Sequence, residues 1–234
     1  MLSSLILFGS RARGDNRPNS DIDLLGITNS GGIEECRANG TSLYTYPIET
    51  LLNKARAGDL FVLHLVQEGR VIHDTEELFT NVGKAFRYKP SYESELRTAS
   101  AVIWILLEHS KSKDDYPIRK RLVWGVRSIL IARLAERRAP AFSSASLSEF
   151  ANDARVRMLI DERSSAPWDA MKSIAADIAN KFGLAHHMLP WPSATDRQLA
   201  ILGELGSMAT STAKMLGYAV AIKRKVTAAS DDYI

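Results

Sequence analysis

The chain has 234 residues, of which 45% are hydrophobic and 24% are charged, and its formal net charge is +3 at pH 7. This length supports a buried core in one large or two small domains, and the composition is that of an ordinary globular protein. The mild positive charge permits a polyanionic partner, but no dense block of lysine and arginine predicts a nucleic-acid surface.

The sequence predicts neither a membrane protein nor a secreted disulfide-rich protein. No apolar run approaches the ~18 residues of a membrane span, and no basic segment precedes the apolar residues at the N-terminus, as a signal peptide requires. Cys36 is the single cysteine, which excludes internal disulfides and a cysteine-based zinc site. We therefore expect a cytoplasmic protein that makes no contact with a membrane.

Two short apolar runs flank a polar loop near the start of the chain. Residues 5–8 predict a buried strand, and residues 22–27 predict its neighbour in an antiparallel or mixed sheet. Asp21 immediately precedes the second run and Asp23 lies within it. Because side chains alternate along a strand, the two aspartates are expected on one face of the sheet.

The sheet pattern continues beyond a turn predicted at residues 29–32. Residues 41–46 alternate polar residues with larger aromatic and aliphatic ones, which predicts a third strand ending at Pro47. The apolar spacing of residues 48–67 is helical and is interrupted at Gly58, so we expect two short helices there. Residues 70–74 predict a short strand that returns to the sheet.

Beyond residue 90 the pattern is helical. Ser91 is expected to cap the first helix, and Ser146 begins a capping-box signature for a shorter one. The expected helices cover residues 93–110, 117–138, a short stretch from 146, 167–185 and 195–225, before a loose tail at 231–234. The sequence therefore predicts the α+β class, with a small mixed-sheet module in residues 1–85 and an all-helical domain, a bundle, in residues 86–234.

The loop after the first strand carries the residue types of a phosphate site. Gly9 allows backbone N–H groups to approach a phosphate closely, and Ser10 adds a hydroxyl donor. Arg11 and Arg13 would neutralise further phosphate oxygens. This loop is therefore a candidate binding site for the phosphates of a nucleotide.

The paired carboxylates complete this pattern. Asp21 and Asp23 repel each other unless a cation lies between them, and carboxylate oxygens are ligands that Mg²⁺ prefers. A metal held against the same phosphates would lower the charge on the attacked phosphorus, as nucleotidyl transfer requires. The alternative is a strand-turn-strand hairpin with polar turn residues, but such a turn does not require two carboxylates on one face.

The same residues carry a family resemblance. Phe8-Gly9-Ser10, a ten-residue spacer and Asp21-Ile22-Asp23-Leu24 resemble the signature of the DNA polymerase β-type nucleotidyltransferase superfamily, in its minimal and kanamycin nucleotidyltransferase-like branch. The resemblance implies that Gly9 and Ser10 bind nucleotide phosphates, together with Arg11 and Arg13. It also implies that Asp21 and Asp23 are catalytic residues that hold Mg²⁺, in a two-metal site, with an NTP, expected to be ATP, as the donor.

The chain departs from the family pattern on its third strand. Relatives place a third carboxylate there as metal ligand and general base, whereas the aligned position here is Ser42 and residues 41–46 contain no acid. Glu49, just past the strand, and Glu68, on the second short helix, are the candidates to replace it. Asp59 is a further acid in this region.

The resemblance leaves the acceptor open. It implies transfer to a hydroxyl of an aminoglycoside-like small molecule, of a partner toxin protein or of tRNA, by an enzyme of the nucleotidyltransferase class. The alternative is a catalytically degenerate relative that binds nucleotide and regulates a partner, as an antitoxin does. A homo-oligomer is compatible with either reading.

Overall fold

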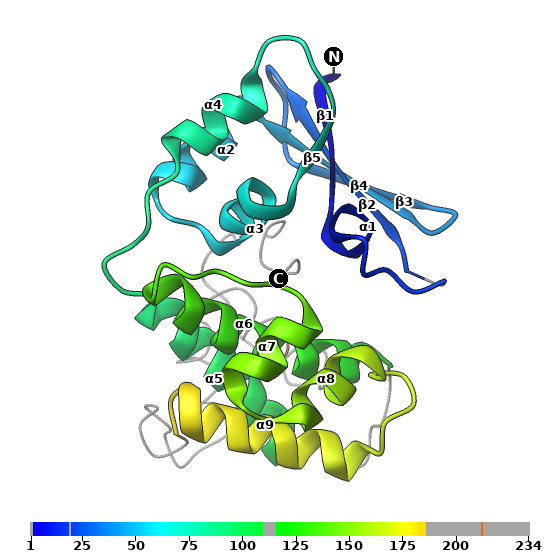
Figure 1. Ribbon diagram of the computed structural model, residues 1–234, viewed down its shortest axis with the longest axis vertical. Helices are drawn as coiled ribbons and strands as arrows, with labels where there is room; N and C mark the ends of the chain where they lie inside the picture. The colour runs from blue at the N-terminus through cyan, green and yellow to red at the C-terminus, as the bar shows by residue number, and fades with distance from the viewer. Residues whose placement is uncertain (1, 19, 110–115, 186–211, 213–234) are drawn as a thin grey trace. The chain divides into compact units, whose positions relative to one another are not determined.

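The computed structural model describes residues 2–18, 20–109, 116–185 and 212. The chain divides into two compact units, Met1–Pro90 and Ser91–Ile234, and each is described by itself. The first contains a five-stranded mixed sheet with helices, and the described part of the second contains helices alone (Figure 1). The α+β class, with a mixed sheet followed by a helical region, is confirmed.

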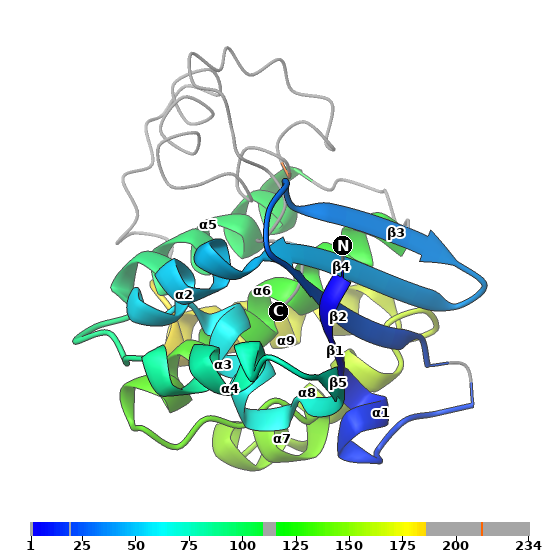
Figure 2. The same ribbon diagram turned by 90° about the horizontal axis from the view of Figure 1, so that it is seen from above.

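The sheet of the first unit has the strand order β3-β4-β2-β1-β5. Its one parallel pair is β2 with β4, and the neighbouring strands otherwise run antiparallel. The strands are β1 (Leu2–Phe8), β2 (Ile22–Thr28), β3 (Glu34–Ala38), β4 (Thr41–Pro47) and β5 (Arg70–Asp74), and the helices of this unit are α1 (Gly9–Arg13), α2 (Ile48–Arg56), α3 (Leu60–Glu68) and α4 (Leu78–Ala85). In both views α2, α3 and α4 gather on one side of the sheet (Figures 1 and 2).

The core of this unit lies between that face of the sheet and α3. The ring of Phe61 on α3 contacts those of Phe8 on β1 and Tyr46 on β4, at centroid distances of 6.0 and 5.6 Å. Burial alternates along β4, so its buried residues share this helix-covered face. Because Phe8 pairs with Asp23 and Asp23 with Ser42, the register places Asp23 on the helix-covered face too.

The strand β3 was not predicted from the sequence. Its five residues are all exposed, and it pairs antiparallel with β4 across a tight turn at Asn39 and Gly40, whose φ angles are 49° and 70°. Two consecutive residues with positive φ form the hairpin turn that Asn-Gly favours. This turn, rather than any apolar run, creates the edge strand.

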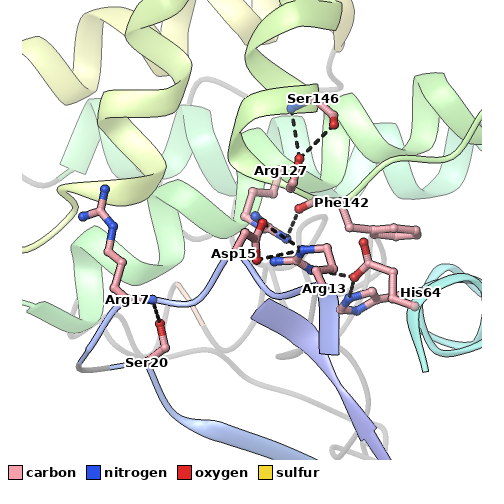
Figure 3. Close-up of polar contacts among 10 residues, drawn as sticks. Arg13, Asp15, Arg17, Ser20, His64, Arg127, Phe142 and Ser146 are labelled. Atoms are coloured by element: carbon pink, nitrogen blue, oxygen red, sulfur yellow. Dashed lines mark hydrogen bonds and ion pairs between the residues drawn. The ribbon is translucent and has the colours of Figure 1, made fainter. Parts of the chain in front are cut away.

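The described part of the second unit consists of packed helices. They are α5 (Glu93–His109), α6 (Tyr116–Glu136), α7 (Ser144–Ala151), α8 (Ala154–Asp161) and α9 (Trp168–Phe182). The cap expected at Ser146 is wrong by three residues, because the Ser143 hydroxyl accepts the hydrogen bond from the Ser146 N–H and thereby begins α7. The backbone carbonyl beside this cap, that of Phe142, accepts a hydrogen bond from Arg127 at 3.0 Å (Figure 3).

Two further expectations concern the helical region. The helix expected at residues 195–225 and the tail at 231–234 lie outside the described residues. Helix α8 was not predicted; it begins where the Asp153 carboxylate accepts a hydrogen bond from the Arg155 N–H. None of the helices that the structure describes is both long and apolar enough to cross a membrane.

Candidate active site

The phosphate loop expected from the sequence is a one-turn helix set between two glycines. Gly9, at φ +74°, turns the chain from β1 into α1, and Gly14, at φ +83°, ends it with a hydrogen bond from its N–H to the Ser10 carbonyl. Both conformations are ones that L-residues with a side chain rarely adopt. The two glycines therefore fix where this turn begins and where it ends.

Gly9 also lies directly against the carboxylate of Asp23. A Cβ atom added at Gly9 would come within 2.7 Å of Asp23 Oδ2, which is closer than van der Waals contact allows. The absence of a side chain is thus what lets the backbone of the loop approach the aspartate. The structure therefore brings together two of the predicted residues, one from each side of the loop.

Asp21 and Asp23 lie at the start of β2. Asp21 is exposed and precedes the strand by one residue, whereas Asp23 is half-buried within it. The register places Asp23 on the helix-covered side of the sheet, and the alternation of side chains along a strand predicts the same side for Asp21. Asp23 stands between Phe8 and Ser42 in the register.

These two carboxylates fit a magnesium ion that also binds a nucleotide. Within the described residues, no three His, Cys, Asp or Glu side chains come together as a metal site, so the chain does not provide an all-protein cage there. Mg²⁺ in nucleotide sites is usually held by one or two carboxylates, with phosphate oxygens and waters supplying the other ligands. A pair of aspartates beside a backbone turn is such a donor set.

Arg11 closes the loop that joins α1 to β2. Its Nε and Nη2 atoms donate hydrogen bonds to the Ser20 carbonyl at 3.1 and 2.7 Å. The Ser20 hydroxyl in turn accepts a hydrogen bond from the Arg17 N–H at 2.9 Å (Figure 3). In the structure this arginine therefore holds the two ends of the loop together.

Arg13 connects the same loop to helix α3. Its Nη1 atom lies 2.5 Å from Glu68 Oε2, and its Nε atom lies 3.1 Å from a carboxylate oxygen of Asp15 (Figure 3). Burial alone would lower the pKa of the Arg13 guanidinium, but the hydrogen bond to Asp15 and the charge of Glu68 raise that pKa above its ordinary value. Arg13 is therefore a permanent cation held in place by two carboxylates.

The same oxygen of Glu68 also contacts His64. His64 Nε2 lies 2.7 Å from Glu68 Oε2, one turn away on α3, and the two side chains are 7% and 11% exposed. The imidazole packs edge-on against the Phe8 ring at the end of β1. Glu68 thus connects the loop of α1 to α3 through a charge network with Arg13 and His64.

The structure does not bring Glu49 to the paired aspartates. Glu49 is exposed in the first turn of α2, beyond the end of β4. From Ser42, which pairs with Asp23, the strand runs on to Pro47 for about 16 Å at ~3.3 Å per residue. Asp59 is the N-cap of α3 and accepts hydrogen bonds from two backbone N–H groups.

Sequence reasoning missed a polar cluster on β3 and β4. The Tyr44 hydroxyl donates to Glu35 Oε1 at 2.7 Å and accepts from Arg37 Nη2 at 3.0 Å, and Arg37 Nε also pairs with Glu35. Burial alone would lower the pKa of Arg37, but its hydrogen bond to Glu35 raises that pKa above its ordinary value. The signal that could have found this cluster is the Asn39-Gly40 turn.

Comparison with known protein families identifies a domain in this chain. The family described as "Nucleotidyltransferase domain" matches residues 2–133 of the chain. A crystal structure of a nucleotidyltransferase-like protein from Exiguobacterium sibiricum is 15% identical to the chain, with a TM-score of 0.31, and covers 77% of this chain and 68% of that one. No curated protein matches the chain.

Proposed function

Because the chain belongs to the nucleotidyltransferase domain family, we propose that it transfers NMP from an NTP, namely ATP, to an acceptor hydroxyl and releases pyrophosphate. The observation that carries this proposal is the close approach of the Gly9 backbone to Asp23 Oδ2. This contact supports a site in which the turn would bind phosphate and the carboxylate would bind the metal of the same nucleotide. A cytoplasmic reaction is part of the proposal, since one free cysteine suits a reducing compartment.

In this proposal the loop of α1 would bind the phosphates of the nucleotide donor. The Gly9 and Ser10 N–H groups and the Ser10 hydroxyl would donate to phosphate oxygens, and Arg11 would keep the loop in this shape by holding the Ser20 carbonyl. Mg²⁺ held by Asp21 and Asp23 would neutralise the phosphates and the developing charge on the leaving pyrophosphate. The acceptor oxygen then forms a bond to the α-phosphorus as the bond to pyrophosphate breaks.

Arg13 has a different role in this proposal from the one that its sequence position suggests. Its guanidinium is engaged by Glu68 and Asp15, so it supports the loop from behind rather than contacting phosphate. Because two carboxylates pair with this one cation, Arg13 adds little net positive charge for an anion at the loop.

A second candidate function is nucleotide binding without transfer, in a regulatory or antitoxin-like partner protein. The observation that favours it is Ser42, a buried hydroxyl residue that pairs with Asp23 in the register. A carboxylate at this position would accept the proton of the acceptor hydroxyl, and serine does not replace it as a base.

The acceptor itself is proposed as a hydroxyl on a small molecule, a protein or tRNA.

The test is label transfer from nucleotides. The protein is incubated with Mg²⁺ and each of the four α-labelled NTPs, together with a small-molecule extract, total protein or bulk tRNA as the acceptor pool. Wild type is expected to label one pool, with ATP as the preferred donor, and the Asp21→Asn/Asp23→Asn variant is expected to label none. Equal labelling by both proteins would contradict transfer at this site.

A further inference from the structure

Several acids of the first unit have contacts elsewhere in it. Asp59 caps α3, and Asp74 accepts hydrogen bonds from the first backbone N–H groups of α4. Glu68 and Asp15 engage Arg13, and Glu49 lies beyond the end of β4. Besides Asp23 and Asp74, the acids on the described strands of this sheet are Glu34 and Glu35, neighbours on β3, which β4 separates from β2.

The register separates these two neighbours. Glu35 pairs with Tyr44, and Tyr44 pairs with Leu25, two residues along β2 from Asp23. Paired residues share a face of the sheet, so Glu35 lies on the same face as Asp23. Glu34, one residue earlier, points to the opposite face and provides a natural comparison.

Glu35 and Asp23 are separated along the sheet by β4. Two strand spacings of ~4.8 Å and two residues of ~3.3 Å place the two Cα atoms about 12 Å apart. An acceptor hydroxyl lying over β4, between the two carboxylates, would face both side chains. The Glu35 side chain is 42% exposed, so an acceptor can reach it across the edge of the sheet.

We propose that Glu35 is the general base of the acceptor half, in place of the acid that β4 lacks at Ser42. This inference rests on the proposed nucleotidyl transfer. The Glu35 carboxylate takes the proton from the acceptor O–H as that oxygen bonds to the α-phosphorus, and the electron pair of the breaking P–O bond leaves on pyrophosphate. The acceptor is then a hydroxyl compound that enters over the exposed strand β3.

Tyr44 and Arg37 are positioning residues in this scheme. Tyr44 is buried, with its hydroxyl 2.7 Å from Glu35 Oε1, so it fixes the carboxylate to the sheet. Arg37 pairs with Ser42 in the register, beside Asp23, and its guanidinium contacts both Glu35 and Tyr44. Together they hold the carboxylate in one position on the face of the sheet that carries Asp23.

The experiment measures pyrophosphate release from ATP in the presence of Mg²⁺, with water and, separately, glycerol as hydroxyl acceptors. Glu35→Gln is expected to lower kcat by about 10²-fold or more, the scale of a lost general base. Glu34→Gln, on the other face of the same strand, is expected to stay within twofold of wild type. Binding of α,β-methylene-ATP should be unchanged in both, since neither residue contacts the donor loop.

The pH dependence distinguishes a base from a structural residue. If Glu35 accepts the proton, the wild-type rate falls at acid pH as the Glu35 carboxylate becomes protonated. Glu35→Asp is expected to be slower than wild type but to show the same fall in rate at acid pH. Glu35→Gln is expected to show no such fall. A Glu35→Gln rate within twofold of wild type, or one that keeps the wild-type acid fall, would overturn the proposal. Equal release by wild type and Asp21→Asn/Asp23→Asn would instead show that the transfer reaction is not at this site, and the inference would fall with it.

Discussion

The two halves of the candidate site are built differently. On the donor side, the loop of α1 is held at both ends, by Arg11 to the Ser20 carbonyl and by Arg13 to Glu68 in the core. On the acceptor side, β3 is an exposed edge strand whose polar side chains contact one another. A phosphate site needs a backbone fixed in advance, whereas an edge strand can admit acceptors of varied shape.

The largest effect is expected from the carboxylates that the two halves share. Asp23→Asn, a substitution close in size, should reduce transfer by about 10³-fold or more, because charge stabilisation by a metal is worth several kcal/mol. Asp21→Asn should act in the same direction. Thermal unfolding of both variants close to that of wild type would show that the loss is chemical, and rates near wild type would contradict the assignment.

A single added methyl group is expected to disrupt nucleotide binding by the donor loop. Gly9→Ala and Gly14→Ala both place a side chain at positive φ, which costs about 1–2 kcal/mol of folding free energy. Only at Gly9 does the new Cβ meet Asp23 Oδ2, whereas nothing lies within 4 Å at Gly14. We expect Gly9→Ala to lose nucleotide affinity by ~10-fold or more and Gly14→Ala to lose much less, as measured by titration calorimetry.

If Gly9→Ala and Gly14→Ala weaken nucleotide binding equally, the contact between Gly9 and Asp23 does not organise the site. Backbone strain alone would then explain both variants. The comparison is informative because the two glycines bound the same turn and differ in what surrounds them.

The anchor behind the donor loop should matter less than the loop itself. Glu68→Gln removes the charge that holds Arg13 and contacts His64, at a site that is 11% exposed. A loss of about 1–3 kcal/mol in unfolding free energy is expected, with a several-fold loss of nucleotide affinity. Glu76→Gln, at an exposed position in the same unit, is the control. It should change neither the free energy of unfolding, measured with urea, nor the nucleotide affinity, measured by calorimetry.

The smallest effect is expected from the tyrosine that contacts Glu35. Tyr44→Phe removes the hydroxyl that bridges Glu35 and Arg37, which should lower the transfer rate a few-fold and cost about 0.5–1.5 kcal/mol of stability. Nucleotide affinity should stay at the wild-type value. A loss of affinity without a loss of rate would show that Tyr44 serves the donor half instead.

The sequence was sufficient for the parts of the fold that local patterns determine. Apolar or alternating patterns predicted β1, β2 and β4, because buried strands are continuous or alternating in hydrophobicity. The short apolar pair at residues 71–72 predicted β5, although its residues are mostly exposed. Strand β3 has no such run, since three of its five residues are charged, and its pairing follows from the Asn39-Gly40 turn. Glu35, the base proposed above, was not singled out from the sequence for the same reason.

Contacts between distant residues were beyond sequence reasoning. Arg13 and Glu68 are separated by 55 positions, and no periodicity indicates that α3 ends against α1. The motif alone suggested that Arg13 faces phosphate and that Glu68 acts near the reacting groups. The structure joins these two residues to each other, a contact that the motif does not indicate.

Metal-dependent nucleotide binding tests the central claim most directly. Titration calorimetry with α,β-methylene-ATP is carried out in Mg²⁺ and in EDTA, for wild type and for Asp21→Asn/Asp23→Asn. If a phosphate loop and two aspartates hold a magnesium nucleotide, wild type binds at least ~10-fold more tightly with Mg²⁺ and the variant loses that difference. Affinity that is the same with and without Mg²⁺ in wild type, or an unchanged metal dependence in the variant, would contradict it.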